Sequence, residues 1–361
     1  MGPGGLEHVV LDLIDHLDRE LFDIQLLCIH RILQPYEEKL SQRRLPFHFI
    51  DKNQKGAFGF YAQLLRLFRT GHFDVVHAHS GCFVESMLPA KLAGVKHTVF
   101  TAHGLPIRSR LSGFQEPIAA LAADKITAVS DEIGMHLRRQ LHCRNGKIEV
   151  VLNGINLHKF YPVRSHQEKQ AIRERFGLPR DAVIIGMVGR LVALKNYPML
   201  LAAFCTVLAH TTQRVHLVIV GRGPERRRLE KFCEDMHIAE SVNFLGNRDD
   251  ISTILKAFDI FSMSSQTEGT SISLLESQAT GLPAVVTDVG GNRMIIDHEK
   301  NGFVVPDRDE LAMSKRLLAL LDHDRRVEMG KHARQKVKAR FDVRTMVNYY
   351  QHLYMDYAGQ Y

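Results

Sequence analysis

The chain has 361 residues, of which 45% are apolar and 24% charged, values typical of a soluble globular protein with room for two domains. Its 47 Lys and Arg against 40 Asp and Glu give a formal net charge of +7, which favours anionic partners such as nucleotides and phosphates. The basic residues are dispersed and form no basic face interleaved with aromatic residues, so the composition argues against a nucleic-acid partner.

Short β-branched apolar runs alternate with helical patterns along the chain, which predicts βαβ units on parallel sheets. In the first half, between helical patterns such as Leu6–Leu17 and Tyr61–Phe68, the predicted strands are Phe22–Ile29, Pro46–Ile50, Asp74–His77, His97–Ala102, Lys125–Val129 and Lys147–Leu152. A turn signal at Asn153-Gly154 and a polar stretch over 156–180 interrupt this pattern. It restarts with the predicted strands Val183–Val188, His216–Val220, Val242–Leu245, Asp259–Phe261 and Ala284–Thr287.

This organisation predicts two doubly wound α/β domains, the first over 1–160 and the second over 161–340. A C-terminal helix over 341–361 is expected to pack back on the first domain. Ligands of such folds bind at the carboxyl ends of the strands, so the cleft between the domains is the expected binding site.

The most informative segment runs from Glu268 to Glu276, between a predicted strand and a helix that continues toward Ala279. Its residues 269–271 occupy the expected start of that helix, where free backbone N–H groups and the helix dipole favour phosphate. The two carboxylates flank this anion site and can accept hydrogen bonds from sugar and ribose hydroxyls. A helix that is merely capped, with acids that complement its dipole, is the structural alternative.

A second segment, residues 189–196, directly follows the strand Val183–Val188. Arg190 and Lys195 can converge on one diphosphate, the arginine as a planar fork and the lysine as a point charge. Cations placed there would stabilise a leaving nucleoside diphosphate. Gly221-Arg222-Gly223-Pro224 follows the next strand and predicts another loop of close backbone approach.

Together these segments resemble the family-four retaining glycosyltransferases, of the two-domain GT-B fold, over nearly the whole chain. The resemblance implies that Glu268 binds hydroxyls of the transferred sugar, that Glu276 binds the nucleotide ribose, and that Arg190 and Lys195 clamp the diphosphate. Residues 242–246 with Arg248 resemble the strand and turn beside the nucleobase, and residues 151–156 with Phe160 resemble the interdomain hinge. The donor-binding residues expected on this basis are Gly4, Gly5, Gly189, Arg190, Lys195, Gly221, Leu245, Arg248, Glu268, Gly269, Thr270, Ser271, Ile272, Leu275 and Glu276.

The first half carries further family-like marks. Gly4 and Gly5 lie in a glycine-rich loop resembling the one that follows the family's first strand. His103 lies in the segment Thr101-Ala102-His103-Gly104. This segment resembles the strand end of the family whose histidine reaches the transferred sugar. With Glu268, Arg190 and Lys195, His103 makes up the predicted catalytic set. His77 and His79 lie in a family-like segment as well and are interpreted as packing residues.

The family's first strand would precede this glycine-rich loop, whereas Met1 stands immediately before it here. A doubly wound sheet places its first strand centrally. We therefore expect an unfilled position between the strands 22–29 and 74–77, and a gain in stability from an upstream strand.

Asp307-Arg308-Asp309 spells the Asp-x-Asp pattern of metal-dependent glycosyltransferases, but it precedes a helix that begins near Leu311. In that place it predicts N-terminal capping. Because Arg190 and Lys195 supply the positive charge, neither a metal nor another cofactor is expected.

The resulting prediction is transfer of a hexose, with retention, from a nucleoside diphosphate sugar, most often UDP-linked in this family, to a glycan or lipid-linked acceptor of cell-envelope synthesis. A GT-B epimerase and a non-catalytic nucleotide-sugar-binding subunit remain as alternatives. Five widely spaced cysteines without a Cys-x-x-Cys pair predict a reducing cytoplasm. Weak contact with the inner leaflet is expected from the stretch Tyr61–Arg69 and from Arg108, Arg110, Arg138, Arg139 and Arg144.

Overall fold

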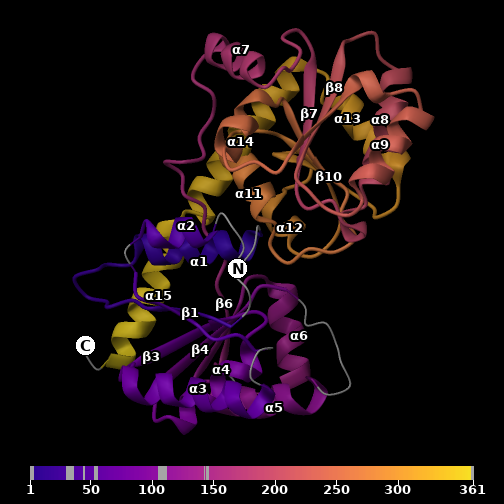
Figure 1. Cartoon of the computed structure of the whole chain (residues 1–361). Helices are drawn as coiled ribbons and strands as arrows, with labels where there is room; N and C mark the ends of the chain where they lie inside the picture. Colours follow the sequence, from indigo (N-terminus) through magenta and orange to yellow (C-terminus); the bar gives the residue numbers. More distant parts are fainter. Residues whose placement is uncertain are drawn as a thin grey trace. The chain divides into compact units, whose positions relative to one another are not determined.

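The computed structural model describes residues 4–29, 36–43, 45–52, 56–104, 112–141, 143 and 146–358. It divides into two compact units. The first unit contains residues 1–154 together with 343–361, and the second contains residues 155–342 (Figure 1). The C-terminal helix α15 (Val343–Ala358) therefore belongs to the first unit, where it packs against α1 (Gly5–His16).

The first unit consists of parallel strands and the helices that connect them. Its strands are β1 (Leu26–Cys28), β2 (Phe47–Phe49), β3 (Val75–His79), β4 (His97–Ala102), β5 (Lys125–Ala128) and β6 (Ile148–Val150). Its other helices are α2 (Tyr36–Ser41), α3 (Gly56–Gly71), α4 (Phe83–Leu92), α5 (Ser112–Ala122) and α6 (Asp131–Leu141). Every ladder is parallel, as the alternation of strand and helix patterns predicted.

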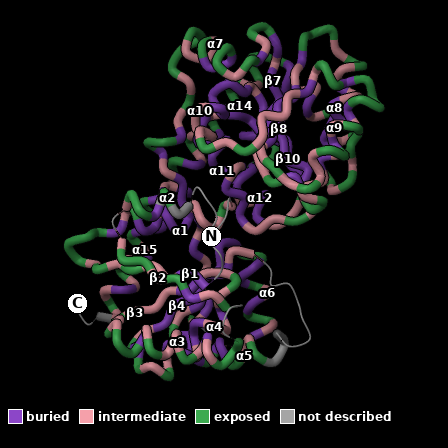
Figure 2. Tube along the Cα trace, in the orientation of Figure 1, coloured by how far each residue is buried: buried purple, intermediate pink, exposed green. Residues whose placement is uncertain are grey.

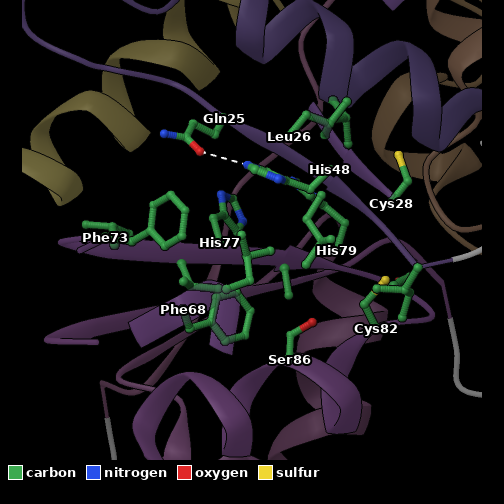
Figure 3. A pocket seen from close by; sticks show the side chains of 18 of the residues that line it. Gln25, Leu26, Cys28, His48, Phe68, Phe73, His77, His79, Cys82 and Ser86 are labelled. Carbon is green, nitrogen blue, oxygen red and sulfur yellow. Dashed lines mark hydrogen bonds between the residues drawn. The ribbon is translucent and has the colours of Figure 1, made fainter. Parts of the chain in front are cut away.

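The strands of this unit form two separate sheets, β1–β2 and β3–β4–β5–β6. Among the described residues β1 does not pair with β3, and a cavity of about 420 Å³ is lined by both strands (Figure 3). Leu6 and Val10 of α1 line the same cavity. The two strands are thus unpaired, as expected, whereas a missing first strand and the stabilising effect of an upstream strand stay predictions.

The strand predicted over Phe22–Ile29 was too long. Residues 18–22 form a turn closed by a hydrogen bond from Phe22 N–H to the carbonyl of Asp18, at 3.0 Å. The Phe22 ring then packs edge-on against Tyr354 of α15, with centroids 5.9 Å apart. Tertiary packing against the C-terminal helix therefore overrides the apolar run, and only Leu26–Cys28 enters the sheet.

The second unit is built on one parallel sheet of six strands in the order β12-β11-β10-β7-β8-β9. Its strands are β7 (Val183–Val188), β8 (Val215–Val220), β9 (Val242–Gly246), β10 (Ile260–Met263), β11 (Ala284–Thr287) and β12 (Gly302–Val305). Its helices are α7 (His166–Arg175), α8 (Tyr197–Ala209), α9 (Arg226–Asp235), α10 (Ile251–Ile254), α11 (Ile272–Ala279), α12 (Asn292–Ile295), α13 (Glu310–Ala319) and α14 (His323–Arg340), with short 3₁₀ turns at Ala193–Lys195, Ala239–Ser241 and Leu255–Ala257.

The chain order places a topological switch point between β7 and β10. From β7 the sheet grows through β8 and β9 in one direction, and it resumes with β10 on the opposite side of β7. Open α/β sheets bind ligands at the carboxyl ends of the strands beside such a point. The inner strands are almost entirely buried (purple in Figure 2), which agrees with their largely apolar sequences.

Strand β12 was not predicted. The last strand predicted from the sequence is Ala284–Thr287, and the run Gly302–Val305 is not among the predicted strands. In the structure this run pairs with β11, and Phe303 is fully buried. Gly302 fits there because an added Cβ would lie 2.4 Å from the carbonyl oxygen of Ala284.

The described residues contain no helix that is both long and apolar enough to cross a membrane. Three of the arginines behind the expected lipid contact, at positions 108, 110 and 144, lie outside the described residues. Arg138 lies on α6 and donates a hydrogen bond to the carbonyl of Ile148 at 3.0 Å, so its side chain supports the fold.

Candidate active site

The loop after β7 carries the first set of predicted site residues. Gly189 continues the sheet by donating its N–H to the carbonyl of Val220 at 2.9 Å, and its own carbonyl accepts the hydroxyl of Tyr197 at 2.9 Å. Arg190 is exposed and makes no ion pair among the described residues. Lys195 ends the short turn that follows. The loop therefore fixes the backbone beneath two cations while leaving Arg190 available to a ligand.

Lys195 and Glu268 meet although 73 residues separate them in sequence. The lysine ammonium and the Glu268 carboxylate form an ion pair, with side chains 20% and 10% exposed. The hydroxyl of Ser265 donates to the same carboxylate oxygen at 2.6 Å. Lys195 follows β7 and Glu268 follows β10, so this pair lies at the switch point of the sheet.

The backbone under Glu268 is held by the loop after β11. Gly291 donates its N–H to the carbonyl of Gly269 at 2.8 Å. A Cβ on Gly290 would lie 1.8 Å from the carbonyl oxygen of Glu268, and this residue has a φ of +53°. Only glycine suits both the left-handed conformation and the close approach at position 290. The two glycines thus fix the position from which Glu268 projects.

Helix α11 begins directly after this segment, with Ser271 as its N-cap. The Ser271 hydroxyl accepts the N–H of Leu274 at 3.4 Å, so one orphan donor of the first turn is satisfied within the protein. Thr270 is 9% exposed and Ser271 4% exposed, so both are buried against the strand ends. The capping that the sequence left open as an alternative is therefore present.

The remaining donor-site predictions on α11 differ in burial. Ile272 is 8% exposed and Glu276, one helical turn later, is 5% exposed, so both lie on the same face of the helix. Leu275 is fully buried and contributes to the core.

The loops after β8 and β9 approach each other closely. Gly221 has a φ of +144° and a Cβ there would lie 1.9 Å from the carbonyl oxygen of Gly189, which requires glycine. Gly221 also donates to the carbonyl of Gly246 at 2.7 Å, next to the predicted nucleobase residue Leu245. These contacts bring three predicted loops to one edge of the sheet.

Arg248 has protein partners of its own. Its guanidinium pairs with both carboxylate oxygens of Asp250, at 3.0 and 2.8 Å, and lies over the ring of Phe176 at 5.1 Å. The hydrogen bonds from Arg248 lower the pKa of Asp250. Arg248 is therefore oriented within the protein and would meet a nucleobase only through its outer edge.

The Asp-x-Asp pattern at Asp307-Arg308-Asp309 is confirmed as a capping element. Asp309 is the N-cap of α13, and its carboxylate accepts the N–H of Ala312 at 2.8 Å. The sign of its charge suits the positive end of the helix dipole.

Three predicted residues belong to the first unit. Gly4 is the N-cap of α1 and Gly5 its first residue. His103 follows β4, with its backbone N–H donated to the Ser80 hydroxyl at 2.7 Å and its ring Nε2 3.0 Å from Nδ1 of His79. Burial lowers the pKa of His103 well below its ordinary value, so the ring is neutral at neutral pH.

The second-unit residues form an arrangement suited to a polyanionic ligand that also carries hydroxyl groups. Lys195 and Arg190 offer positive charge, the start of α11 adds backbone N–H groups, and Glu268 offers carboxylate oxygens as acceptors. Lys195 offsets the charge of the Glu268 carboxylate, whose side chain is 10% exposed. A diphosphate and a sugar meet these requirements together.

Several residues of this arrangement were missed from the sequence. Ser265, Tyr197 and the pair Gly290-Gly291 hold the predicted residues in place. Adjacent glycines soon after the strand Ala284–Thr287, with two residues between, are a signal that could have identified the loop after β11. Ser265 and Tyr197 carry no such signal, because each acts on a residue that only folding brings near.

Comparison with known families agrees with this geometry. Residues 168–336 match the sequence profile of the glycosyl transferases group 1, and residues 3–159 match that of glycosyltransferase family 4. The chain belongs to these family-four, group 1 glycosyltransferases, has their GT-B fold, and is a glycosyltransferase.

Relatives from two bacteria align over most of the chain. The chain is 29% identical to the UDP-Gal:alpha-D-GlcNAc-diphosphoundecaprenol alpha-1,3-galactosyltransferase of Escherichia coli, covering 98% of this chain and 94% of that protein. It is also 29% identical to the putative glycosyltransferase EpsF of Bacillus subtilis, covering 80% of this chain and 77% of that protein.

Solved structures share the fold at lower identity. A glycosyltransferase from Rickettsia africae superposes with a TM-score of 0.86 at 20% identity, covering 99% of this chain and 96% of that one. The Anabaena HepE protein in complex with UDP superposes with a TM-score of 0.82 at 19% identity, covering 98% and 96%.

Proposed function

We propose that the protein transfers a hexose from a UDP-sugar to a hydroxyl of a lipid-linked or glycan acceptor in cell-envelope synthesis, with retention of the anomeric configuration. The observation that carries the proposal is the Lys195–Glu268 pair at the switch point between β7 and β10, beside the start of α11. The E. coli relative is named for UDP-galactose and a diphosphoundecaprenol acceptor, and HepE is described in complex with UDP and with UDP-glucose. These names support the UDP-sugar donor and the lipid-linked acceptor.

In the proposed reaction each residue has one task. Arg190 and Lys195 bind the diphosphate and stabilise the charge that develops as the bond between C1 of the sugar and the β-phosphate oxygen breaks. Glu268 accepts hydrogen bonds from hydroxyls of the transferred sugar, and Glu276 accepts those of the ribose. His103 contacts the sugar from the first unit.

Retention is proposed to follow a front-face course. The ring nitrogen Nε2 of His103 is bound by another neutral histidine rather than by a carboxylate, so this residue brings no nucleophile with it. The acceptor hydroxyl then attacks C1 from the side on which the diphosphate leaves. Its proton passes to the leaving phosphate oxygen, so the new C1–O bond forms while the old one breaks.

The direct test is a transfer assay with labelled UDP-galactose, UDP-glucose, UDP-N-acetylglucosamine, GDP-mannose and ADP-glucose, against short-chain polyprenyl diphosphate sugars. We expect transfer from one UDP-sugar and an α-linked product from an α-linked donor, read by proton NMR. Glu268→Gln should abolish most of the transfer, whereas Glu240→Gln, at an exposed position of the same unit, should not. A β-linked product would contradict retention.

Two other outcomes would replace the proposal. Epimerised donor or free sugar formed without acceptor would indicate an epimerase or a hydrolase. Tight binding of UDP-sugars without turnover on a membrane-lipid extract would indicate a non-catalytic binding subunit.

A further inference from the structure

Two consecutive residues at the carboxyl end of β3 hold His103 by both its backbone and its ring. Ser80 accepts the backbone N–H of His103 at 2.7 Å. His79 places its Nδ1 3.0 Å from Nε2 of His103, with ring centroids 5.2 Å apart. Since β3 and β4 are paired in register, with His79 opposite Thr101, the position of this contact is set by the sheet.

His79 is itself supported from one side. Its ring lies against the ring of His77, with centroids 4.3 Å apart and planes tilted by 33° (Figure 3). His77 cannot rotate freely, because its Nδ1 lies 2.5 Å from the Tyr354 hydroxyl and its Nε2 lies 2.7 Å from the Thr101 hydroxyl. Helix α15 therefore holds His77 through Tyr354, His77 packs against His79, and His79 is hydrogen-bonded to His103.

The two rings in contact are both neutral at neutral pH. Burial lowers the pKa of His79 to about 4 and that of His103 well below its ordinary value. In a neutral imidazole one nitrogen donates and the other accepts. A hydrogen bond between two neutral rings therefore couples their tautomers, because one nitrogen of the pair must carry the proton and the other must not. Among the described residues nothing is hydrogen-bonded to Nδ1 of His103, so this nitrogen remains for a ligand.

We propose that His79 is a positioning residue for His103: it fixes the ring orientation and, through their coupled tautomers, selects the tautomer in which Nδ1 of His103 meets the transferred sugar. The inference rests on the role proposed above for His103 and gives His79 a task beyond packing. A single tautomer presents the sugar hydroxyl with one defined donor or acceptor. A ring that exchanges freely between tautomers would present a donor and an acceptor in turn, so only part of the bound substrate would meet the correct group.

The first test compares two substitutions of different chemistry. The amide of His79→Asn places a polar atom near the former Nδ1 and can donate or accept, whereas His79→Leu fills a similar volume without polar atoms. We expect His79→Leu to lower kcat about 10- to 100-fold with a much smaller change in donor KM, and His79→Asn to stay within about 3-fold of the native protein. An equal loss in both variants would overturn the proposal.

The matched control is His97→Leu. His97 stands at the opposite end of β4 and stacks on Tyr357 of α15 with centroids 4.3 Å apart, so its loss disturbs the same unit without touching His103. It should lower the melting temperature about as much as His79→Leu does and leave kcat unchanged. If this control loses kcat to the same extent, the loss of kcat in His79→Leu comes from lower stability and not from the lost contact with His103.

The second test reads the tautomer without turnover. The ¹⁵N resonances of His103, assigned by their disappearance in His103→Ala, should show one protonated ring nitrogen in the native protein and exchange between two tautomers in His79→Leu. The same spectrum in both proteins would overturn the proposal. Full transfer activity of His103→Ala would refute the proposed role of His103 itself. If the native protein shows a single tautomer of His103 but no transfer activity, the proposed function is wrong and the His79–His103 contact still stands.

Discussion

Acidification should destabilise the first unit through three partly buried histidines, His77, His79 and His103. Burial lowers the pKa of His77, His79 and His103, so the unfolded chain binds protons at a pH where the folded unit does not. The contribution of these neutral histidines to the free energy of unfolding is fully present above pH 6.5, the pKa of histidine in the unfolded chain. It is lost as the pH falls toward their pKa in the folded unit. The expected loss therefore begins below pH 6.5 and continues to about pH 4.

His79 gives the size of the effect, since its pKa moves from 6.5 to about 4. Proton linkage for one such group predicts that a change from about pH 7 to about pH 5.5 costs about 1.2 kcal/mol of the free energy of unfolding. This value is an upper limit for His79, because its ring lines the cavity between β1 and β3 and water can reach one edge. His77 and His103 change in the same direction and add to the loss.

Urea unfolding followed by tyrosine fluorescence suits this measurement, because seven of the nine tyrosines lie in the first unit and the chain has no tryptophan. His79→Asn should reduce the loss between the two pH values by up to about 1.2 kcal/mol. The titratable side chains that line the cavity together with His79 are those of Glu7, Cys28, His48, His77 and Cys82, and the ring of His103 is hydrogen-bonded to it. Stability that is unchanged or higher at pH 5.5 would refute the assignment of neutral buried histidines.

The remaining predictions concern the donor site and the membrane. Glu276→Ala should weaken the binding of both the donor and bare UDP by about 1.5–3 kcal/mol. Glu268→Ala should lower turnover and leave the affinity for UDP unchanged. Calorimetry that finds equal losses of UDP affinity in the two variants would contradict these roles. Arg190→Ala should leave the melting temperature of the ligand-free protein unchanged, because Arg190 is exposed. Lys195→Ala should lower that temperature, because Glu268 loses its cation. Both substitutions should lower kcat, and a lower melting temperature for Arg190→Ala than for Lys195→Ala would contradict the Lys195–Glu268 pairing. Transfer should survive EDTA, so activity that is lost and then restored by magnesium or manganese would disprove metal independence. Co-sedimentation with anionic vesicles at low salt should detect a weak membrane contact, and its absence would end that hypothesis.

Much of the fold could be predicted because the local pattern is strong. The run Val183–Val188 and the run Ala284–Thr287 are strands with the bounds that their β-branched residues indicate. The prediction failed where a distant partner decides the local structure. Phe22 left the predicted strand for a contact with Tyr354, 332 residues later, and Gly302–Val305 became a strand only because β11 offers a free edge.

The same division holds for the site. The family, the acid-flanked segment Glu268–Glu276 and the capping role of Asp309 could be predicted, since each depends on residues close together in the chain. The pairing of Lys195 with Glu268, the support of its backbone by Gly290 and the contact of His79 with His103 emerged only on folding. These contacts join the ends of different parallel strands, and parallel strands are connected by long crossovers. Local periodicity therefore carries no information about which loops meet at the edge of the sheet.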